Sequence, residues 1–231
     1  MWETPETPFP VSSVEEIQRI QSERKRLAVE RAKDSAFFAG RLDHLNLNRL
    51  DDPDEWHKIP ILTKDELRAL QPDRFFEDFC IGAREDVVEY WRSGGVTGKP
   101  LFYPRSHDDL RFGLEAFRRL WLTADVGPSD LVQISFPLGI HPVGSLYART
   151  AEELGIGTIW CGAGNSTPSE LQVELILTLK PTVFAGMASY GLQIAQVAKT
   201  MGVNLAESSV TKFITAAEPL SPGKRMRIET M

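Results

Sequence analysis

From residue 130 onward, short apolar runs alternate with stretches whose apolar residues recur at helical spacing. The runs "DLVQISF", "GTIWC", "PTVFAG" and "SVTKFITA" are typical of buried strands, and a helical pattern follows each of them. Strands that alternate with helices about every 25 residues favour right-handed crossovers between parallel strands. The pattern therefore predicts an α/β fold with a largely parallel sheet and flanking helices.

Local signals predict where the helices of this region begin and end. Thr167 is expected to cap the helix in "TPSELQVELILTLK", with Pro168 at its first position and Glu170 three residues after the cap. Gly202 is a plausible end for "ASYGLQIAQVAKTMG", and Ser221 opens a helix in "SPGKRMRIETM".

The first half of the chain predicts helices and a pair of strands. Residues 1–11 are expected to form an irregular arm, and residues 12–40 a long helix that begins near Ser13 and stops at Gly40. Thr63 should cap a short helix in "TKDELRAL". The segments "EDVVEYWR" and "LFYP" are typical of strands, and "SHDDLRFGLEAFRRLWLTA" of a helix whose aromatic residues belong to the core.

Four short segments follow the strands of the parallel sheet: "PLGIHP", "CGAGN", "GMASY" and "TAAEP". Ligands of open α/β sheets bind at the carboxyl ends of the strands, and small residues let the backbone approach a ligand closely. Each segment alone could be an ordinary strand-to-helix turn. Together with a neighbouring glycine-rich loop, they indicate a binding site.

That loop, "RSGGVTGKP", lies between the two predicted strands of the first half. A Walker loop needs a glycine where Ser93 stands, a Ser or Thr where Pro100 follows Gly98 and Lys99, and a helix after the loop. The spacing of a dinucleotide fingerprint is missing as well. Successive backbone amides, the Thr97 hydroxyl and the Lys99 charge could bind an anion, although a plain glycine-rich hairpin is an alternative.

Composition narrows the choice of partners. The net charge is -6, with 42% hydrophobic and 25% charged residues, which fits a globular protein and disfavours nucleic acid as a partner. Two cysteines, far apart, disfavour a disulfide framework or a cysteine-rich zinc site and fit a reducing compartment. No signal peptide or membrane-length apolar stretch is visible, so a cytoplasmic protein without a membrane partner is expected.

The loop resembles the phosphate loop of acyl-adenylate-forming enzymes, and most closely that of the phenylacetate–coenzyme A ligase branch, which has Ser-Ser-Gly-Thr-Thr-Gly-Lys-Pro. Three further segments are similar to that branch: "IPILTKDELRA", "GAGNSTPSELQVELILTLKPTVFAGMASYGLQIA" and "AAEPLSPGKRMRIE". Their order and spacing hold from about residue 56 onward. The resemblance implies an N-terminal arm and helix at residues 1–55. It also implies a truncated N-terminal AMP-binding (adenylation) domain at residues 56–231, without the family's C-terminal lid domain.

The resemblance implies ATP-dependent ligation of a small carboxylic acid to coenzyme A, with Mg²⁺. Residues expected to hold the ATP phosphates are Ser93, Gly94, Gly95, Thr97, Gly98 and Lys99. Residues expected to line the adenine are Ala216, Ala217, Glu218 and Pro219. The acyl pocket is expected to include Leu138, His141, Ser189 and Tyr190. The family's catalytic lysine and metal-linked glutamate have no counterpart in this sequence, so no metal ligand is expected here.

The sequence departs from the family at several positions. Gly94 and Val96 replace hydroxyl residues of the loop, and the Val96 change removes a donor worth about 1.5–3 kcal/mol to a charged oxygen. Leu138 and His141 stand where the branch has pocket aromatics, which argues against phenylacetate itself as the substrate. A hydrogen-bonded turn histidine is an alternative role for His141.

Two functions remain open at this stage. The first is an ATP-dependent acid–coenzyme A ligase, or its N-terminal portion, which is expected to be incomplete as a catalyst alone. Its expected partner is a second copy in a homo-oligomer or a chain that supplies the C-terminal half. The second is a non-catalytic nucleotide- or acyl-binding module related to such ligases. A plain phosphotransferase is disfavoured by the failed Walker pattern.

Overall fold

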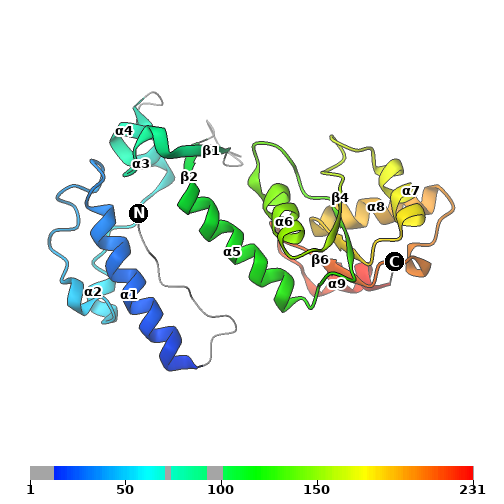
Figure 1. Ribbon diagram of the computed structural model, residues 1–231, viewed down its shortest axis with the longest axis horizontal. Helices are drawn as coiled ribbons and strands as arrows, with labels where there is room; N and C mark the ends of the chain where they lie inside the picture. Colours follow the sequence, from blue (N-terminus) through cyan, green and yellow to red (C-terminus); the bar gives the residue numbers. More distant parts are fainter. Residues whose placement is uncertain (1–12, 71–73, 93–100, 231) are drawn as a thin grey trace.

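The computed structural model describes residues 13–70, 74–92 and 101–230 (Figure 1). The predicted arm at residues 1–11 and the glycine-rich loop at residues 93–99 lie outside the described residues. Figure 1 follows the chain from a helical N-terminal part, through a hairpin and a long helix, to a parallel sheet with helices on both faces.

The predicted parallel sheet is confirmed. Its four strands are all parallel, in the order β4-β3-β5-β6. They comprise β3 (Leu131–Ile134), β4 (Gly157–Trp160), β5 (Val183–Ala185) and β6 (Lys212–Ile214). The connecting helices are α6 (Pro142–Glu153), α7 (Ser169–Leu179) and α8 (Ala188–Thr200), and α9 (Pro222–Glu229) follows β6.

The two faces of the sheet pack against different helices. On one face, β3 and β5 contribute Val132, Ile134 and Val183 to an apolar cluster with Trp121 of α5 and Tyr147 of α6. On the opposite face, under α7 and α8, a second apolar cluster contains Val173, Ile176, Phe184, Tyr190, Ile194 and Ala198. Because successive side chains of a strand point to opposite faces, neighbouring residues of β5 enter different clusters.

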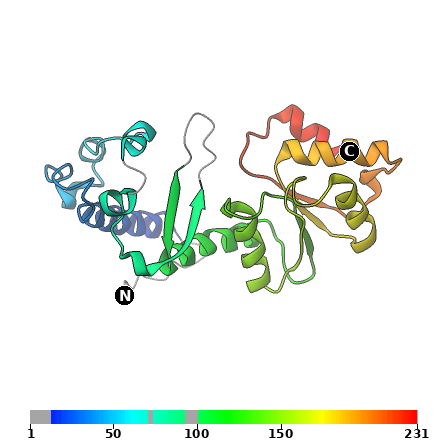
Figure 2. The ribbon, with the colours of Figure 1, turned by 90° about the horizontal axis from the view of Figure 1, so that it is seen from above.

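The hairpin consists of β1 (Val87–Arg92) and β2 (Phe102–Ser106), which pair antiparallel. The chain continues directly into α5 (His107–Thr123), where Ser106 and Asp109 form a capping box. Figure 2 shows the hairpin between the helical N-terminal part and the sheet. Because α5 packs on α6, it connects the hairpin to the sheet.

The N-terminal part contains one long helix, α1 (Val14–Ala32), and several short helical segments, and Val29, Leu42 and Leu50 form an apolar cluster there. The short segments are η1 (Leu47–Arg49), α2 (Pro53–Trp56), α3 (Lys64–Ala69), α4 (Phe75–Phe79) and η2 (Arg84–Asp86). The predicted caps at Ser13 and Thr63 are confirmed, the latter as a complete capping box with Glu66. The proposed boundary near residue 56 between two domains stays a prediction.

Two predicted helix ends were wrong. The first helix ends at Ala32 and does not reach Gly40. Beyond the helix, the Phe37 N–H donates to the Asp78 carbonyl (2.8 Å), and the Phe37 ring packs against Phe79 of α4. The N-cap of α7 is Pro168 in place of Thr167, and no side-chain hydrogen bond caps that helix.

Candidate functional site

The four predicted turns lie together at the carboxyl edge of the sheet, each after one parallel strand. Backbone hydrogen bonds continue the strand pairing into these turns. The N–H groups of Cys161 and Gly162 both donate to the Ile134 carbonyl, at 3.0 and 2.9 Å. The Gly186 N–H donates to the Ile214 carbonyl at 3.0 Å. The turns are therefore fixed relative to one another by the sheet itself.

Close packing explains why small residues occur at this edge. A Cβ atom on Gly144, in the first turn of α6, would lie 2.5 Å from the Pro137 carbonyl oxygen. A Cβ atom on Gly162 would lie 3.3 Å from Leu138 Cδ1, and the φ angle of Gly162 is +70°. Leu138, a predicted acyl-pocket residue, therefore lies between α6 and the turn after β4, and it is half-buried.

A buried polar network underlies three of the four turns. Its centre is the side chain of Gln172 on α7, which is 0% exposed. The Gln172 Nε2 atom lies 3.1 Å from the Gly162 carbonyl oxygen, 2.9 Å from that of Thr167 and 2.9 Å from the Tyr190 hydroxyl. Its Oε1 atom accepts from Ser135 Oγ at 2.8 Å, at the end of β3. The network joins segments that are far apart in the sequence.

Tyr190 and Ser189 occupy different environments although they are neighbours. The Tyr190 side chain is 6% exposed, and its hydroxyl lies 3.3 Å from Ser169 Oγ. Burial raises the pKa of Tyr190, and the Ser169 hydrogen bond partly offsets this effect. Ser189 is exposed at the start of α8. Tyr190 thus belongs to the buried wall beneath the edge, whereas Ser189 lies at its surface.

Glu218, in the turn after β6, lies at the N-terminus of α8. The Glu218 carboxylate accepts a hydrogen bond from the Ser189 N–H, and Lys224 lies 3.6 Å away from it. The Ser189 N–H holds the pKa of Glu218 below its usual value, and Lys224 acts in the same direction. Ala217 has a φ angle of 72°, which is uncommon for a residue with a side chain. Ala216 is half-buried, and Pro219 is exposed.

His141 is the N-cap residue of α6 and is half-buried. Its side chain makes no capping hydrogen bond to that helix. Both Leu138 and His141 therefore lie on the turn after β3, as expected from the sequence. Which of the predicted residues contact a ligand stays a prediction, because no ligand is present.

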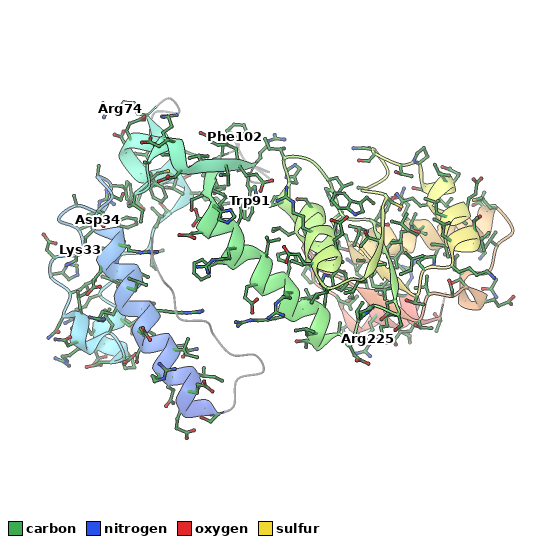
Figure 3. All side chains as sticks on the ribbon, viewed as in Figure 1. Lys33, Asp34, Arg74, Trp91, Phe102 and Arg225 are labelled. Carbon is green, nitrogen blue, oxygen red and sulfur yellow. The ribbon has the colours of Figure 1, made fainter. Side chains whose placement is uncertain are left out.

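The hairpin is attached to the same edge of the sheet. The Arg92 N–H donates to the Ile140 carbonyl at 3.1 Å, in the turn after β3. Arg149 of α6 makes a two-pronged ion pair with Glu89, at 3.2 and 3.0 Å, and this arginine lowers the pKa of Glu89. Trp91 packs over α5 (Figure 3), where a Cβ atom on Gly113 would lie 3.6 Å from its ring.

The predicted phosphate-binding residues, Ser93 to Lys99, lie outside the described residues. Arg92 is the described residue directly before them. Because the Arg92 N–H is bonded to the turn after β3, this last described residue before them lies beside the carboxyl edge of the sheet.

Sequence reasoning missed the buried polar network. Gln133 and Ser135 alternate with Val132, Ile134 and Phe136 in "LVQISF", and all five are buried. The signal was present, because a glutamine inside a fully buried strand needs a polar partner. The partner on α7 could not be identified from the sequence, since 39 residues separate Gln133 from Gln172.

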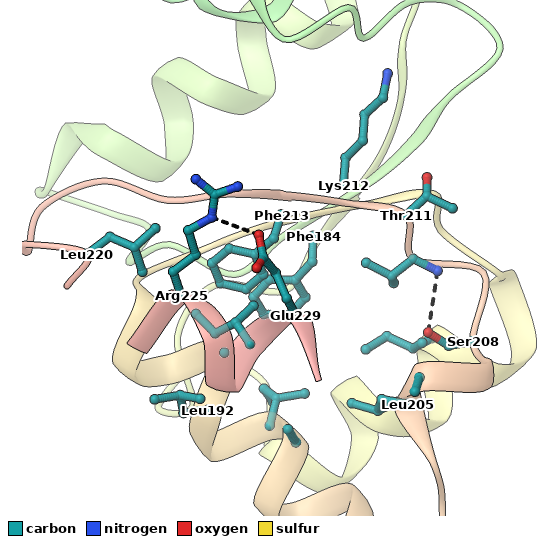
Figure 4. A pocket seen from close by; sticks show the side chains of 17 residues that line it. Phe184, Leu192, Leu205, Ser208, Thr211, Lys212, Phe213, Leu220, Arg225 and Glu229 are labelled. Atoms are coloured by element: carbon teal, nitrogen blue, oxygen red, sulfur yellow. Dashed lines mark hydrogen bonds and ion pairs between the residues drawn. The ribbon is translucent and has the colours of Figure 1, made fainter. Parts of the chain in front are cut away.

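A cavity of about 550 Å³ lies between α8, β6 and α9 (Figure 4). Phe184, Phe213 and Leu220 are among the apolar residues that line it, and an Arg225–Glu229 ion pair of 2.7 Å lies on α9 at its border. None of the predicted site residues that the structure describes lines it. The cavity therefore gives no support to the predicted adenine or acyl contacts.

The described residues show neither a cluster of metal ligands nor a membrane-spanning helix. Among these residues, no group of three or more His, Cys, Asp or Glu side chains could hold a metal ion. No helix in the described part of the chain is long and apolar enough to cross a membrane.

No protein-family model matches the chain. Phenylacetate–coenzyme A ligase of Escherichia coli (strain K12) is 26% identical over 226 residues, which are 96% of this chain and 50% of that protein. The Thermus thermophilus enzyme of the same name is 27% identical over 222 residues, which are 93% of this chain and 47% of that protein. The chain thus spans about half the length of the curated relatives it matches.

Solved structures share the fold. A crystal structure of 2-hydroxyisobutyryl-CoA ligase in complex with 2-HIB-AMP and CoA, in its thioesterification state, has a TM-score of 0.85 at 21% identity. The match covers 99% of this chain and 52% of that one. An open conformation of the same ligase has a TM-score of 0.84 and covers 99% of this chain. The chain therefore has the fold of part of a coenzyme A ligase, and the resemblance to phenylacetate–coenzyme A ligases is confirmed over nearly its whole length.

Proposed function

We propose that this chain provides the nucleotide- and acid-binding part of an ATP-dependent carboxylic acid–coenzyme A ligase. In the first step, a carboxylate oxygen bonds to the α-phosphorus of ATP while the bond to the β-phosphate breaks, and pyrophosphate leaves. In the second step, the thiol sulfur of coenzyme A bonds to the acyl carbon, AMP leaves and the thiol proton is released. The names of the relatives, phenylacetate–coenzyme A ligase and 2-hydroxyisobutyryl-CoA ligase, support this reaction class.

The observation that carries the proposal is the hydrogen bond between the Arg92 N–H and the Ile140 carbonyl. It attaches the start of the glycine-rich loop to the turn after β3. Phosphates bound by backbone amides of the loop would then lie beside the carboxyl edge of the sheet, where an open α/β fold binds its ligand. Catalysis at such a site rests on positioning the reactants and neutralising phosphate charge.

We assign the ligand groups to the edge as follows. The loop from Ser93 to Lys99 would hold the phosphates, and the turn from Ala216 to Pro219 would border the adenine. Leu138, His141 and Ser189 would border the acid. Tyr190 would shape the wall from beneath, because its hydroxyl already lies near Gln172 and Ser169.

The co-substrates would be ATP and coenzyme A, with Mg²⁺ arriving on the ATP phosphates. Since the described residues contain no cluster of metal ligands, we assign no protein ligand to Mg²⁺. The two cysteines, both free thiols, fit the reducing cytoplasm, which we propose as the location. The acid is a small carboxylic acid other than phenylacetate, given Leu138 and His141. The part of the relatives' length that this chain does not cover would complete the catalyst.

Calorimetry of ATP binding in the presence of Mg²⁺ tests the proposal, using the chain and a Thr97→Ala, Lys99→Ala double variant. We expect binding to the chain and at least tenfold weaker binding to the variant, because a hydroxyl donor and a positive charge are lost together. Carboxylate-dependent exchange of pyrophosphate into ATP then tests the first chemical step.

Three outcomes are informative. Loop-dependent ATP binding with exchange supports a ligase. Loop-dependent binding without exchange, even after the other half of a relative is added, supports a non-catalytic nucleotide-binding module. A folded chain that does not bind ATP, or a double variant that binds it equally well, contradicts the proposal.

A further inference from the structure

We propose that Gln172 is a positioning residue for the acid end of the site, where it holds the Gly162–Thr167 turn and the Tyr190 hydroxyl in one arrangement. The proposal rests on the proposed function. It adds a role in acid specificity for the Gln172 side chain, which is fully buried on α7 and does not reach the surface.

The carboxamide of Gln172 is the only described side chain that joins two carbonyls of this turn to Tyr190. Its Nε2 atom carries two hydrogens. Three oxygen atoms lie near it: the Gly162 carbonyl at 3.1 Å, the Thr167 carbonyl at 2.9 Å and the Tyr190 hydroxyl at 2.9 Å. The carbonyl oxygens can only accept, whereas the hydroxyl can also donate to Ser169 Oγ, 3.3 Å away. Residues of α7 thus fix both the turn and the phenol.

The other end of the carboxamide is fixed by β3. The Oε1 atom accepts from Ser135 Oγ at 2.8 Å and lies 3.4 Å from Gln133 Nε2. Among the described residues, the Gln133 Oε1 atom is buried without a hydrogen-bond partner. A buried polar atom without a partner is unfavourable for folding, because its desolvation is not compensated. A polar group that is retained at such a cost, beneath a proposed site, suggests that its geometry matters to that site.

The turn that Gln172 holds lies between Leu138, which we assign to the acid, and Tyr190, which we assign to the wall beneath it. On one side, a Cβ atom on Gly162 would lie 3.3 Å from Leu138 Cδ1. On the other side, a Cβ atom on Gly164 would lie 3.3 Å from the Tyr190 hydroxyl. A shift of the turn by a few tenths of an ångström would therefore change its contacts with both Leu138 and Tyr190. Arg92, at the start of the phosphate loop, bonds to a different turn.

It follows that a change at Gln172 should alter recognition of the acyl group more than recognition of the nucleotide. The ligand class concerned is the apolar part of a carboxylic acid, in the form of its acyl-adenylate. A purely structural role for Gln172 would weaken folding without this selective effect.

Calorimetry with three probes tests the inference: AMP, and two stable acyl-adenylate analogues, the N-phenylacetyl- and N-(2-methylpropanoyl)sulfamoyl adenosines. The proteins are the full chain, Gln172→Met, which keeps the volume but loses the amide, and Gln193→Met as a matched control on the exposed surface of α8. We expect at least one analogue to bind the unchanged chain more tightly than AMP. In Gln172→Met, that preference should fall at least fivefold while AMP affinity changes less than twofold. The control should match the unchanged chain.

The remaining outcomes are decisive as well. An unchanged preference in a folded Gln172→Met variant overturns the inference, as does the absence of any preference for an analogue in the unchanged chain. Failure of AMP and of both analogues to bind the unchanged chain would instead overturn the proposed function. If Gln172→Met does not fold, Tyr190→Phe removes only the phenol oxygen that α7 fixes. The preference should then fall at least twofold, and an unchanged preference overturns the inference.

Discussion

The two faces of strand β3 are equally buried but differ in chemistry. Val132 and Ile134 enter a cluster of apolar side chains with Trp121 and Tyr147. Gln133, on the opposite face, lies in a network of amides and hydroxyls with Gln172. Val132, Gln133 and Ile134 are all 0% exposed, so burial alone does not distinguish these residues.

This difference suggests separate roles for the two faces, one in stabilising the fold and the other in positioning the turns. Apolar burial stabilises the fold without specifying one orientation of a group, because the hydrophobic effect is non-directional. Hydrogen bonds are directional, so a network of them permits few alternative arrangements. The apolar face should therefore carry most of the folding free energy, and the polar face should fix the turns at the carboxyl edge.

The largest effect is expected on the apolar face. Ile134→Ala removes a completely buried side chain from the centre of the sheet and leaves a cavity. We expect a loss of about 2–5 kcal/mol in the free energy of unfolding, measured by urea denaturation. ATP affinity of the folded fraction should stay within twofold, because the backbone carbonyl of Ile134 still accepts from Cys161 and Gly162. A loss below 1 kcal/mol would break the comparison.

A smaller effect on stability is expected on the polar face. Ser135→Ala removes the donor that lies 2.8 Å from Gln172 Oε1 and leaves that buried oxygen with one long contact. The free energy of unfolding should fall by about 1–3 kcal/mol, the cost of an unsatisfied buried polar atom. Ser129→Ala, at an exposed loop position, is the matched control and should be neutral. Equal stability of both variants would mean that the network contributes nothing in solution.

The smallest effect at neutral pH is expected from Tyr147→Phe, and it should grow in alkali. Burial raises the pKa of Tyr147 to about 12 from the ordinary value of 10.0. Between these two values the folded state holds a proton that the unfolded state has lost, so stability falls as the pH rises through this window. The phenylalanine variant lacks this loss. Its free energy of unfolding relative to the unchanged chain should therefore increase from pH 10 towards pH 12, and a difference independent of pH would contradict the shift.

The elements were largely predictable because their signals are local. Alternation of strand and helix patterns predicted the parallel sheet, and the caps at Ser13, Thr63 and Ser221 were confirmed. The predicted helix end at Gly40 was wrong: the helix ends at Ala32, and the following segment bonds through the Phe37 N–H to Asp78, a residue distant in the sequence. The cap of α7 was misplaced by one residue, a common limit of local signals.

For the candidate site, the sequence determined which segments meet at one edge, because parallel strands bring their carboxyl ends together. It also supplied the family resemblance, which relatives and solved structures confirm over half their length. Only the tertiary structure decided that Gln172 joins Gly162, Thr167 and Tyr190, that Glu218 accepts from Ser189, and that Arg92 bonds to Ile140. These contacts depend on distances of a few ångströms between segments far apart in the chain, and no pattern along the sequence encodes such distances.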